Sequence, residues 1–461
     1  MPDIAPDIFK AYDIRGIVGR NLTEEAAYLI GRAIAARAAA QGICEIALGR
    51  DGRLSGPALM AALARGLTDS SLKVLNVGMV ATPMLYFAAV QHCGGSGVMI
   101  TGSHNPPDYN GFKMMLGGQT LAGDNIQALR HRIETEDFVS GSPHGHVRQH
   151  DIAAEYQNHI SGHIRLARPL KIVIDAGNGV AGAFAGKLYR ALGCDVTELF
   201  CEVDGHFPNH HPDPAKPENL QDLMRALRES DAEIGLAFDG DGDRLGVVTK
   251  AGHIIYPDRQ LMLFAQDVLS RHPGAKIIFD VKSSRLLTPW ITEHGGEAIM
   301  GKTGHSFMKA AMKQHGALLA GEMSGHVFFK ERWFGFDDGL YAGARLLEIL
   351  SASPDPSAVL DALPEGVSTP EINIDVPAGE NGHALIAELA AQARFAGEQQ
   401  RITLDGLRVE FADGFGLMRA SNTTPVLVLR FEADNAAALA RIQAQFRTVI
   451  DRRPGLIWPQ A

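Results

Sequence analysis

The first third of the chain alternates short apolar runs with longer helical segments, and small polar residues follow each run. Residues 46–49, 74–78 and 97–100 have the length and composition of buried strands. A helix predicted over 57–67 and another beginning at Thr82-Pro83 separate them. Strands that alternate with helices form right-handed βαβ units and a mostly parallel sheet. The sequence therefore predicts an α/β fold with polar loops at the strand ends, where open α/β sheets bind ligands.

The length of the chain predicts several domains, because 461 residues exceed what one hydrophobic core supports. A linker-like stretch at 140–150 and prolines near 354–364 mark boundaries. Beyond them the pattern changes to alternating, meander-like strands at 372–376, 408–411 and 426–431 and a final helix over 436–451. We predict three α/β domains at 1–147, 148–252 and 253–364 and a smaller α+β domain at 365–461.

Charge and cysteine content exclude several classes of protein. The net charge of −10 argues against a nucleic-acid surface, although a local cluster of Arg and Lys can still bind phosphate. Four cysteines without C-x-x-C spacing argue against a disulfide framework or a zinc knuckle and fit a reducing compartment. The first ten residues lack the apolar core of a signal peptide. We therefore expect a soluble, cytoplasmic protein.

One long segment without charged residues resembles a membrane span in its charge content. Residues 74–107 contain no Asp, Glu, Lys or Arg. Pro83 and the pair Gly94-Gly95 interrupt the segment, so it cannot supply the ~20 unbroken apolar residues of a membrane helix. We interpret it as a buried strand–helix–strand.

The segment Thr101-Gly-Ser-His-Asn-Pro106 follows the strand predicted at 97–100. Ser103 thus lies just past a strand end, where its hydroxyl could attack a substrate or carry a group covalently. The alternative is a Ser/Asn-rich turn without chemistry.

The segment Asp239-Gly-Asp-Gly-Asp-Arg244 follows another apolar run and is the most specific pattern in the chain. Three carboxylates at i, i+2 and i+4 point to one side of an extended segment and repel one another unless a cation neutralises them. Oxygen ligands indicate a hard ion, Mg²⁺ or Ca²⁺. An EF-hand is excluded, because its sixth and twelfth positions would be Arg244 and Lys250. The alternative is a solvated acidic turn.

Two further loops contain groups suited to a sugar phosphate. Glu322 and Ser324 lie two residues apart, so an extended loop would present both to paired sugar hydroxyls; a capping Glu and a turn Ser are the alternative. The segment 419–425 combines Arg419 with hydroxyls and an amide that can cradle a phosphate, or it forms a simple turn with a surface arginine. Arg15 could likewise contact an anion.

A competing pattern, G-x-G-x-x-G, spans Gly177 to Gly182 after a predicted strand. With Glu198 downstream it would indicate a dinucleotide site and an oxidoreductase. We favour a tight strand–helix turn, because the pattern alone is weak.

The loops at 101–106, 239–244, 321–326 and 419–425 occur together and in this order. In this respect the chain resembles the α-D-phosphohexomutase superfamily over essentially its whole length, and within it the bacterial phosphomannomutase/phosphoglucomutase group. Met323 matches that group better than phosphoglucosamine mutases, which usually have Gln there. Gly102 replaces the alanine of the usual serine loop, from which we expect a more flexible loop. The resemblance implies three similar mixed-sheet α/β domains and a smaller C-terminal α+β domain around a central cleft.

The resemblance also implies the reaction. Hexose 1-phosphate and hexose 6-phosphate, of glucose and mannose, would interconvert through phospho-Ser103 and a hexose 1,6-bisphosphate, with glucose 1,6-bisphosphate as activator. Asp239, Asp241, Asp243 and a phosphoserine oxygen would hold Mg²⁺. The enzyme would be a monomer that binds small hexose phosphates, with no nucleic acid or membrane partner. A phosphoglucosamine mutase, the oxidoreductase and a non-catalytic sugar-phosphate binder are the alternatives.

The resemblance further implies roles for named residues. Glu322 and Ser324 would bind the 3- and 4-hydroxyls of the sugar. The candidates for acid and base, which would surround the transfer site, are Arg15, His104, Lys113 and His326. The residues that would bind the remote phosphate are Arg419, Ser421, Asn422 and Thr423. Further substrate contacts would come from Tyr12, Arg244, Lys282 and His305.

Overall fold

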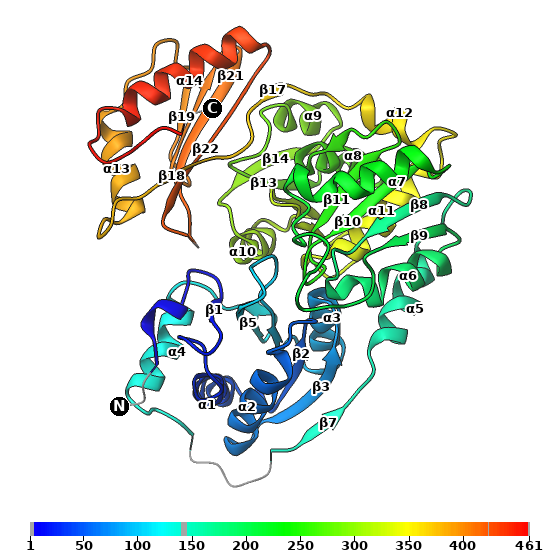
Figure 1. Ribbon diagram of the computed structural model, residues 1–461, viewed down its shortest axis with the longest axis vertical. Helices are drawn as coiled ribbons and strands as arrows, with labels where there is room; N and C mark the ends of the chain where they lie inside the picture. Colours follow the sequence, from blue (N-terminus) through cyan, green and yellow to red (C-terminus); the bar gives the residue numbers. More distant parts are fainter. Residues whose placement is uncertain (1–3, 140–144, 423, 460–461) are drawn as a thin grey trace.

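Four β-sheets follow one another along the chain, each with its own helices (Figure 1). The structure is a computed structural model and describes residues 4–139, 145–422 and 424–459. The first three sheets mix parallel and antiparallel strands, and the C-terminal sheet is antiparallel throughout its described pairs. The predicted fold class is confirmed.

The first sheet has the strand order β1-β5-β4-β2-β3-β7, and β6 pairs with β5. Its strands are β1 (Ile14–Ile17), β2 (Glu45–Arg50), β3 (Lys73–Met79), β4 (Gly97–Ile100), β5 (Tyr109–Leu116), β6 (Gln119–Thr120) and β7 (Val147–Gln149). Its helices are the 3₁₀ turn η1 (Pro6–Ile8), α1 (Glu24–Ala40), α2 (Gly56–Asp69), α3 (Thr82–His92) and α4 (Asp124–Glu134). Alternate residues of β2 enter different cores: Ile46 and Leu48 pack with α1, α2 and α4, whereas Ala47 packs with α3.

The second and third sheets have the orders β12-β11-β10-β8-β9 and β14-β13-β15-β16. Their strands are β8 (Lys171–Asp175), β9 (Asp195–Leu199), β10 (Ile234–Phe238), β11 (Leu245–Thr249), β12 (Ile254–Ile255), β13 (Lys276–Asp280), β14 (Glu297–Gly301), β15 (Leu319–Gly321) and β16 (Val327–Phe329). Their helices are α5 (Ala153–His163), η2 (Val180–Ala183), α6 (Ala185–Ala191), η3 (Pro217–Leu220), α7 (Gln221–Glu229), α8 (Pro257–Arg271), α9 (Leu287–Glu293), α10 (His305–His315), α11 (Gly339–Leu350) and α12 (Pro356–Asp361).

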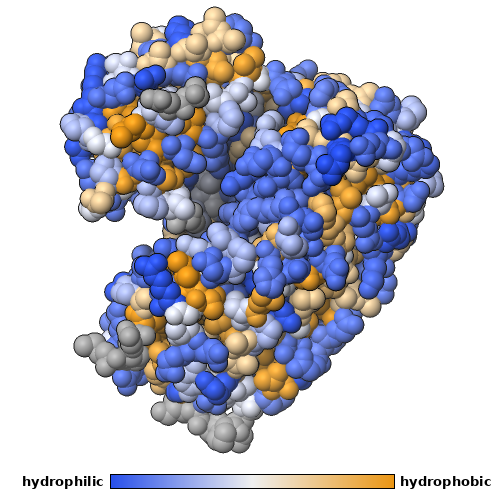
Figure 2. Space-filling model, in the orientation of Figure 1, coloured by the Kyte–Doolittle hydropathy of each residue, from blue (hydrophilic) through white to orange (hydrophobic). Residues whose placement is uncertain are grey.

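The fourth sheet has the order β17-β22-β21-β20-β19, and β18 pairs with β22. Its elements are β17 (Val367–Ser368), β18 (Ile372–Asp375), α13 (Gly382–Gln392), β19 (Gln400–Ile402), β20 (Leu407–Phe411), β21 (Gly414–Ala420), β22 (Val426–Ala433) and α14 (Ala436–Ile450). A deep hollow separates much of this domain from the first one (Figure 2).

All four loops singled out in the sequence join a strand to an antiparallel neighbour. The serine loop joins β4 to β5, the aspartate loop joins β10 to β11, and the loop of Glu322 joins β15 to β16. The loop after Arg419 joins β21 to β22. The three similar domains therefore present their loops from equivalent positions.

Most of the uncharged segment at 74–107 is buried, as expected. Helix α3 is buried along Thr82–Ala89 and packs into a core shared by the first three domains. A helix that is apolar on all sides is stable only where it is covered on all sides. Among the described residues, no helix has both the length and the apolar character that a membrane crossing requires.

The glycine pattern at 177–182 forms a tightly packed turn. A Cβ at Gly182 would lie 2.3 Å from the carbonyl oxygen of Cys201, and one at Gly179 would lie 2.9 Å from that of Ala176. Gly177 has φ +50°. The glycines thus serve close backbone packing, which explains the pattern without a nucleotide.

Candidate active site

The aspartate loop concentrates negative charge in a buried place. Asp239, Asp241 and Asp243 are 0% exposed, and one carboxylate oxygen from each lies within 4.8 Å of the other two. The backbone N–H groups of Gly242 and Asp243 donate to Oδ1 of Asp239 at 3.0 and 3.1 Å. The turn therefore holds the carboxylates in place but neutralises little of their charge.

Two oxygens of this cluster have no hydrogen bond. Oδ1 of Asp241 and Oδ1 of Asp243 are buried and have no hydrogen-bond partner among the residues that the structure describes. Burial, followed by the charges of Asp243 and Asp241, raises the pKa of Asp239 well above its usual value. Unpaired buried carboxylate oxygens fit a hard divalent cation, which would satisfy the orphaned oxygens and neutralise the repulsion.

Ser103 lies against this cluster, although 136 positions separate it from Asp239. Its Oγ donates to Oδ2 of Asp239 at 3.0 Å and lies 3.1 Å from Nδ1 of His104. Ser103 is 2% exposed and has φ +49°, a left-handed conformation that is uncommon for a residue with a side chain. Such strained backbone persists only where its surroundings hold it.

Arg53 supplies that support, a role that was not predicted from the sequence. Its buried guanidinium donates to the carbonyl oxygens of Ser103 (2.8 Å), Asn105 (2.6 Å), Pro106 (2.5 Å) and Tyr109 (2.9 Å). We call this arrangement the Arg53 clamp. The only signal in the sequence is the turn that contains this arginine, Arg50-Asp51-Gly52-Arg53, and it does not reveal a partner 50 positions away.

Asp51 and Gly102 complete the surroundings of the clamp. Asp51 accepts from the hydroxyl of Thr101 at 2.8 Å and lies 3.4 Å from Nε of Arg53. A Cβ at Gly102 would lie 2.4 Å from the guanidinium. The expectation that Gly102 makes the loop more flexible stays a prediction; the missing side chain leaves room for the guanidinium of Arg53 against the loop.

The four candidates for acid and base surround Ser103. Lys113, on β5, donates to Asp241 at 2.8 Å and also to Asp243. His326 Nε2 lies 3.4 Å from Oδ1 of Asp243. Arg15, on β1, donates to Oδ1 of Asn105 at 2.9 Å. The structure thus brings all four together with the hydroxyl.

The charges of these groups follow from burial and pairing. Burial, followed by the positive charges of Arg244 and Arg15, lowers the pKa of His104 well below its usual value. Burial alone would also lower the pKa of Lys113, but Asp241 and Asp243 raise it well above its usual value. At neutral pH His104 is therefore neutral and Lys113 is charged.

Glu322 and Ser324 converge on His326. Oε2 of Glu322 lies 3.4 Å from Nδ1 of His326, and Oγ of Ser324 lies 2.8 Å from the same atom. The other carboxylate oxygen of Glu322 accepts from the N–H of Gly304 at 2.5 Å. Arg244 Nε lies 3.3 Å from Nε2 of His326, so the aspartate loop and this loop are in direct contact.

Tyr12 connects the first domain to the third and the fourth. Its ring centroid lies 5.8 Å from that of His305, and its hydroxyl pairs with Asn422. Burial raises the pKa of Tyr12 to about 12, so its hydroxyl stays protonated. Arg419 is also buried here and pairs with Asp405 at 3.1 Å.

Two of the remaining residues predicted to contact the substrate, Ser421 and Lys282, have partners in the structure. Ser421 accepts from the backbone N–H of Thr424 at 3.2 Å within the same loop. Lys282 pairs with Glu371 at 2.6 Å, across the junction of the third and fourth domains. Thr423 lies outside the described residues.

Three residues at the site, Thr82, Lys309 and Asp337, had not been predicted as site residues from the sequence. Thr82, at the start of α3, donates to Oδ2 of Asp241 at 2.6 Å. Asp337 accepts from Lys309 at 2.9 Å, and its second oxygen, which has no hydrogen-bond partner among the described residues, lies 3.9 Å from His326. No local motif marks these positions.

Four domain models of one family match this chain in order. They are described as phosphoglucomutase/phosphomannomutase α/β/α domain I (residues 6–140), domain II (154–252) and domain III (256–366) and the C-terminal domain (371–449). The chain belongs to the phosphoglucomutase/phosphomannomutase family, within the α-D-phosphohexomutase superfamily.

Relatives match along the whole chain. A protein of Neisseria meningitidis named phosphoglucomutase is 74% identical over 459 residues and covers 100% of both chains. A protein of Pseudomonas aeruginosa named phosphomannomutase/phosphoglucomutase is 59% identical over 447 residues, covering 97% of this chain and 96% of its own. A crystal structure of a phosphoglucomutase/phosphomannomutase family protein from Burkholderia thailandensis has a TM-score of 0.94 at 58% identity, covering 99% of this chain and 100% of that one.

Proposed function

We propose that this chain reversibly interconverts hexose 1-phosphate and hexose 6-phosphate, with glucose and mannose as the sugars. The observation that carries the proposal is the contact of Ser103 Oγ with Asp239, inside a buried cluster of three carboxylates. The names of relatives that match the whole chain support the same reaction. Nothing in these comparisons favours a phosphoglucosamine mutase, an oxidoreductase or a non-catalytic binder.

Ser103 would carry the phosphoryl group between turnovers. The bond from its Oγ to phosphorus breaks as a sugar hydroxyl forms a new bond to phosphorus; the sugar hydroxyl gives its proton to a base, and the departing serine oxygen takes up a proton. The product is a hexose 1,6-bisphosphate. It reorients within the hollow, so that its two phosphates exchange places, and returns its other phosphoryl group to Ser103. Glucose 1,6-bisphosphate would restore the phosphorylated enzyme whenever that intermediate escapes.

The charges at the site suit these steps. His104 is neutral at pH 7 and lies 3.1 Å from the serine oxygen, so it can accept a proton there. Lys113 stays charged and can balance the negative charge of a phosphoryl group. A divalent cation held by Asp239, Asp241 and Asp243, for which we propose Mg²⁺, would polarise the phosphoryl oxygens when bound.

The rest of the site would hold the substrate at its other end. Glu322 and Ser324 would bind the 3- and 4-hydroxyls of the sugar. Because glucose and mannose differ only at carbon 2, these contacts would accept both sugars. Arg419, with Ser421, Asn422 and Thr423, would hold the remote phosphate, and Tyr12, Arg244, Lys282 and His305 would add contacts. We further propose a cytoplasmic monomer, since the four cysteines are free and one chain supplies every group of the site.

Replacing the serine tests the proposal. Ser103→Ala removes the phosphoryl carrier, so we expect mutase turnover with glucose 1-phosphate to fall by at least about 1,000-fold in a coupled assay. Intact mass of the active parent enzyme should show one phosphoryl group that the variant lacks. Ser270→Ala, on the exposed side of α8, is the matched control and should keep full activity.

Each outcome has a defined meaning. Near-normal turnover of Ser103→Ala would exclude this serine as the carrier. Comparing glucose, mannose and glucosamine 1-phosphates in the parent enzyme then separates the proposed substrates from the phosphoglucosamine alternative. Activity that needs a nicotinamide cofactor would contradict the proposal entirely.

A further inference from the structure

We propose that His92, His150 and Glu155 form a second divalent-metal site, selective for a borderline ion such as Zn²⁺ and separate from the aspartate loop. The proposal does not depend on the proposed mutase function. Nε2 of His92 lies 2.9 Å from one carboxylate oxygen of Glu155, and Nε2 of His150 lies 2.7 Å from the other. One donor atom of each residue lies within 4.8 Å of the other two.

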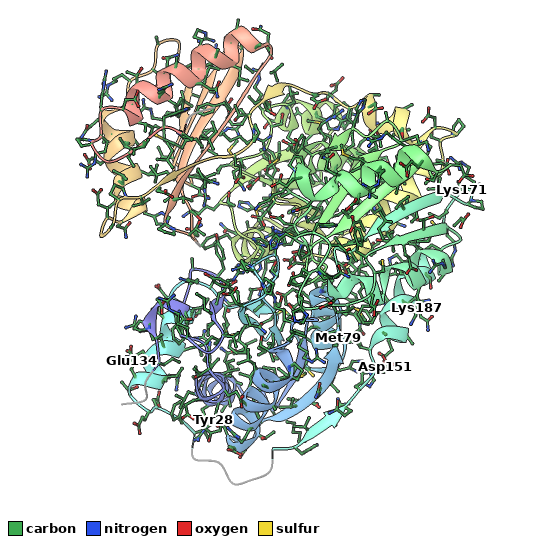
Figure 3. All side chains as sticks on the ribbon, in the orientation of Figure 1. Tyr28, Met79, Glu134, Asp151, Lys171 and Lys187 are labelled. Carbon is green, nitrogen blue, oxygen red and sulfur yellow. The ribbon has the colours of Figure 1, made fainter. Side chains whose placement is uncertain are left out.

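Three separate elements bring these donors together. His92 is the last residue of α3, His150 directly follows β7, and Glu155 lies in the first turn of α5. The N–H of His150 donates to the carbonyl oxygen of Asn76 at 2.9 Å, which fixes that residue to β3. Figure 3 labels Asp151, the neighbour of His150, where the chain passes from β7 to α5. An ion here would join the first sheet to the helix that follows it.

The donor set discriminates between metals. Two imidazole nitrogens and one carboxylate oxygen form a set typical of Zn²⁺, whereas the oxygens of the aspartate loop suit Mg²⁺. Ligands bound to one tetrahedral zinc at about 2.0–2.2 Å lie about 3.3–3.5 Å from one another. Donors that already lie within 4.8 Å therefore need shifts of only about an ångström or two.

The site is accessible to water, and the nearby arginine does not occupy the carboxylate of Glu155. The side chains of His92, His150 and Glu155 are 28%, 26% and 43% exposed, so water can reach an ion and complete its coordination. The nearby Arg148 is engaged by Glu45 at 2.8 Å. Within the part of the chain that the structure describes, Glu155 has recorded side-chain partners only in the two histidines.

The length of helix α3 separates this site from the aspartate loop. Thr82 at its first residue contacts Asp241, and His92 is its last residue. Eleven residues at about 1.5 Å each place the two ends roughly 15 Å apart. An ion at His92 therefore touches no group of the proposed active site, and we expect it to stabilise the junction without being required for turnover.

Zinc titration of the chelator-treated full chain tests the proposal. With Mg²⁺ saturating throughout, so that the aspartate loop is occupied, calorimetry should show one Zn²⁺ per chain. His150→Gln and Glu155→Gln should each weaken that binding at least about tenfold. His131→Gln, an exposed histidine on α4, is the control and should bind as the parent does. Zn²⁺ should also raise the Tm of the parent and not that of the two variants.

Two results would overturn the proposal. One is equal zinc affinity and stoichiometry in the parent, His150→Gln and Glu155→Gln. The other is a binding event that disappears in Asp239→Asn and persists in Glu155→Gln, which would assign the zinc to the aspartate loop. Co²⁺ gives a second readout, because its visible absorption bands should appear in the parent and be absent in His150→Gln.

Discussion

The Arg53 clamp makes one side chain responsible for the shape of the serine loop. Arg53→Lys keeps the charge but replaces a planar fork with one ammonium group, which cannot donate to four carbonyl oxygens in the same directions. We expect kcat to fall about 100-fold with little change in KM, because displacing a reacting atom by about 1 Å has a cost of that order. Steady-state kinetics with glucose 1-phosphate give both values.

The control and a second readout separate positioning from general damage. Arg20→Lys makes the same change at an exposed residue and should leave kcat unchanged. Intact mass should show that Arg53→Lys takes up the phosphoryl group more slowly than the parent. Parental kcat in Arg53→Lys would mean that the clamp does not position Ser103.

Single residues also mark the limit of what the sequence could predict. The aspartate loop was predictable because its spacing alone concentrates charge. The clamp was not, because Arg53 and Ser103 lie 50 positions apart and only the folded backbone brings them together. The close approach of Arg53 to Gly102 was not predictable for the same reason.

At the scale of the element, α11 begins with a buried carboxyl group. Asp338 accepts from the N–H of Tyr341 at 2.8 Å and from the hydroxyl of Tyr156 at 2.8 Å. Burial raises the pKa of Asp338 from 3.8 to about 7, so the folded chain holds a proton that the unfolded chain has released. The stability from this protonated carboxyl is fully present below about pH 4 and is lost as pH rises to about 7.

Asp338→Asn tests this dependence, because an amide keeps the capping oxygen and cannot ionise. The stability of the variant relative to the parent should rise between pH 4 and pH 7, by roughly 4 kcal/mol at most, and then level off. Urea unfolding across this range measures the difference. Asp355→Asn, at the exposed N-cap of α12, should show no such rise; an equal rise in both variants would contradict the assignment to Asp338.

The order and type of the elements were largely predictable, and the direction of strand pairing was not. The strand expected at 97–100 is β4, and the final helix expected over 436–451 is α14, which ends at Ile450. Apolar runs show where strands lie but not which way neighbours run. The antiparallel step after β4, β10 and β15 therefore emerged only from the structure.

At the scale of the whole molecule, the C-terminal domain contributes the end of β21 and the loop after it to the proposed site. Arg419 lies at the end of β21, and Asn422 contacts Tyr12 of the first domain. Arg419→Ala should raise KM for glucose 1-phosphate about 10- to 100-fold, because a charge-assisted hydrogen bond to phosphate contributes about 1.5–3 kcal/mol. We expect kcat to change much less. Steady-state kinetics resolve the two effects.

Arg401→Ala is the control in the same domain, because Arg401 lies on β19 and pairs with Glu398 instead of with the residues around Arg419. It should leave KM unchanged. An unchanged KM and kcat/KM in Arg419→Ala would remove this arginine from the phosphate site and leave the reaction at Ser103 unaffected.

The contribution of every domain to one site has a consequence for synthesis on the ribosome. Ser103 emerges 136 residues before Asp239, and Arg419 emerges later still. Until the second domain has folded onto the first, the serine of a nascent chain lacks this acidic partner, and until the fourth has folded the chain lacks the proposed place for the far end of a substrate. We therefore expect productive phosphoryl transfer to require all four domains.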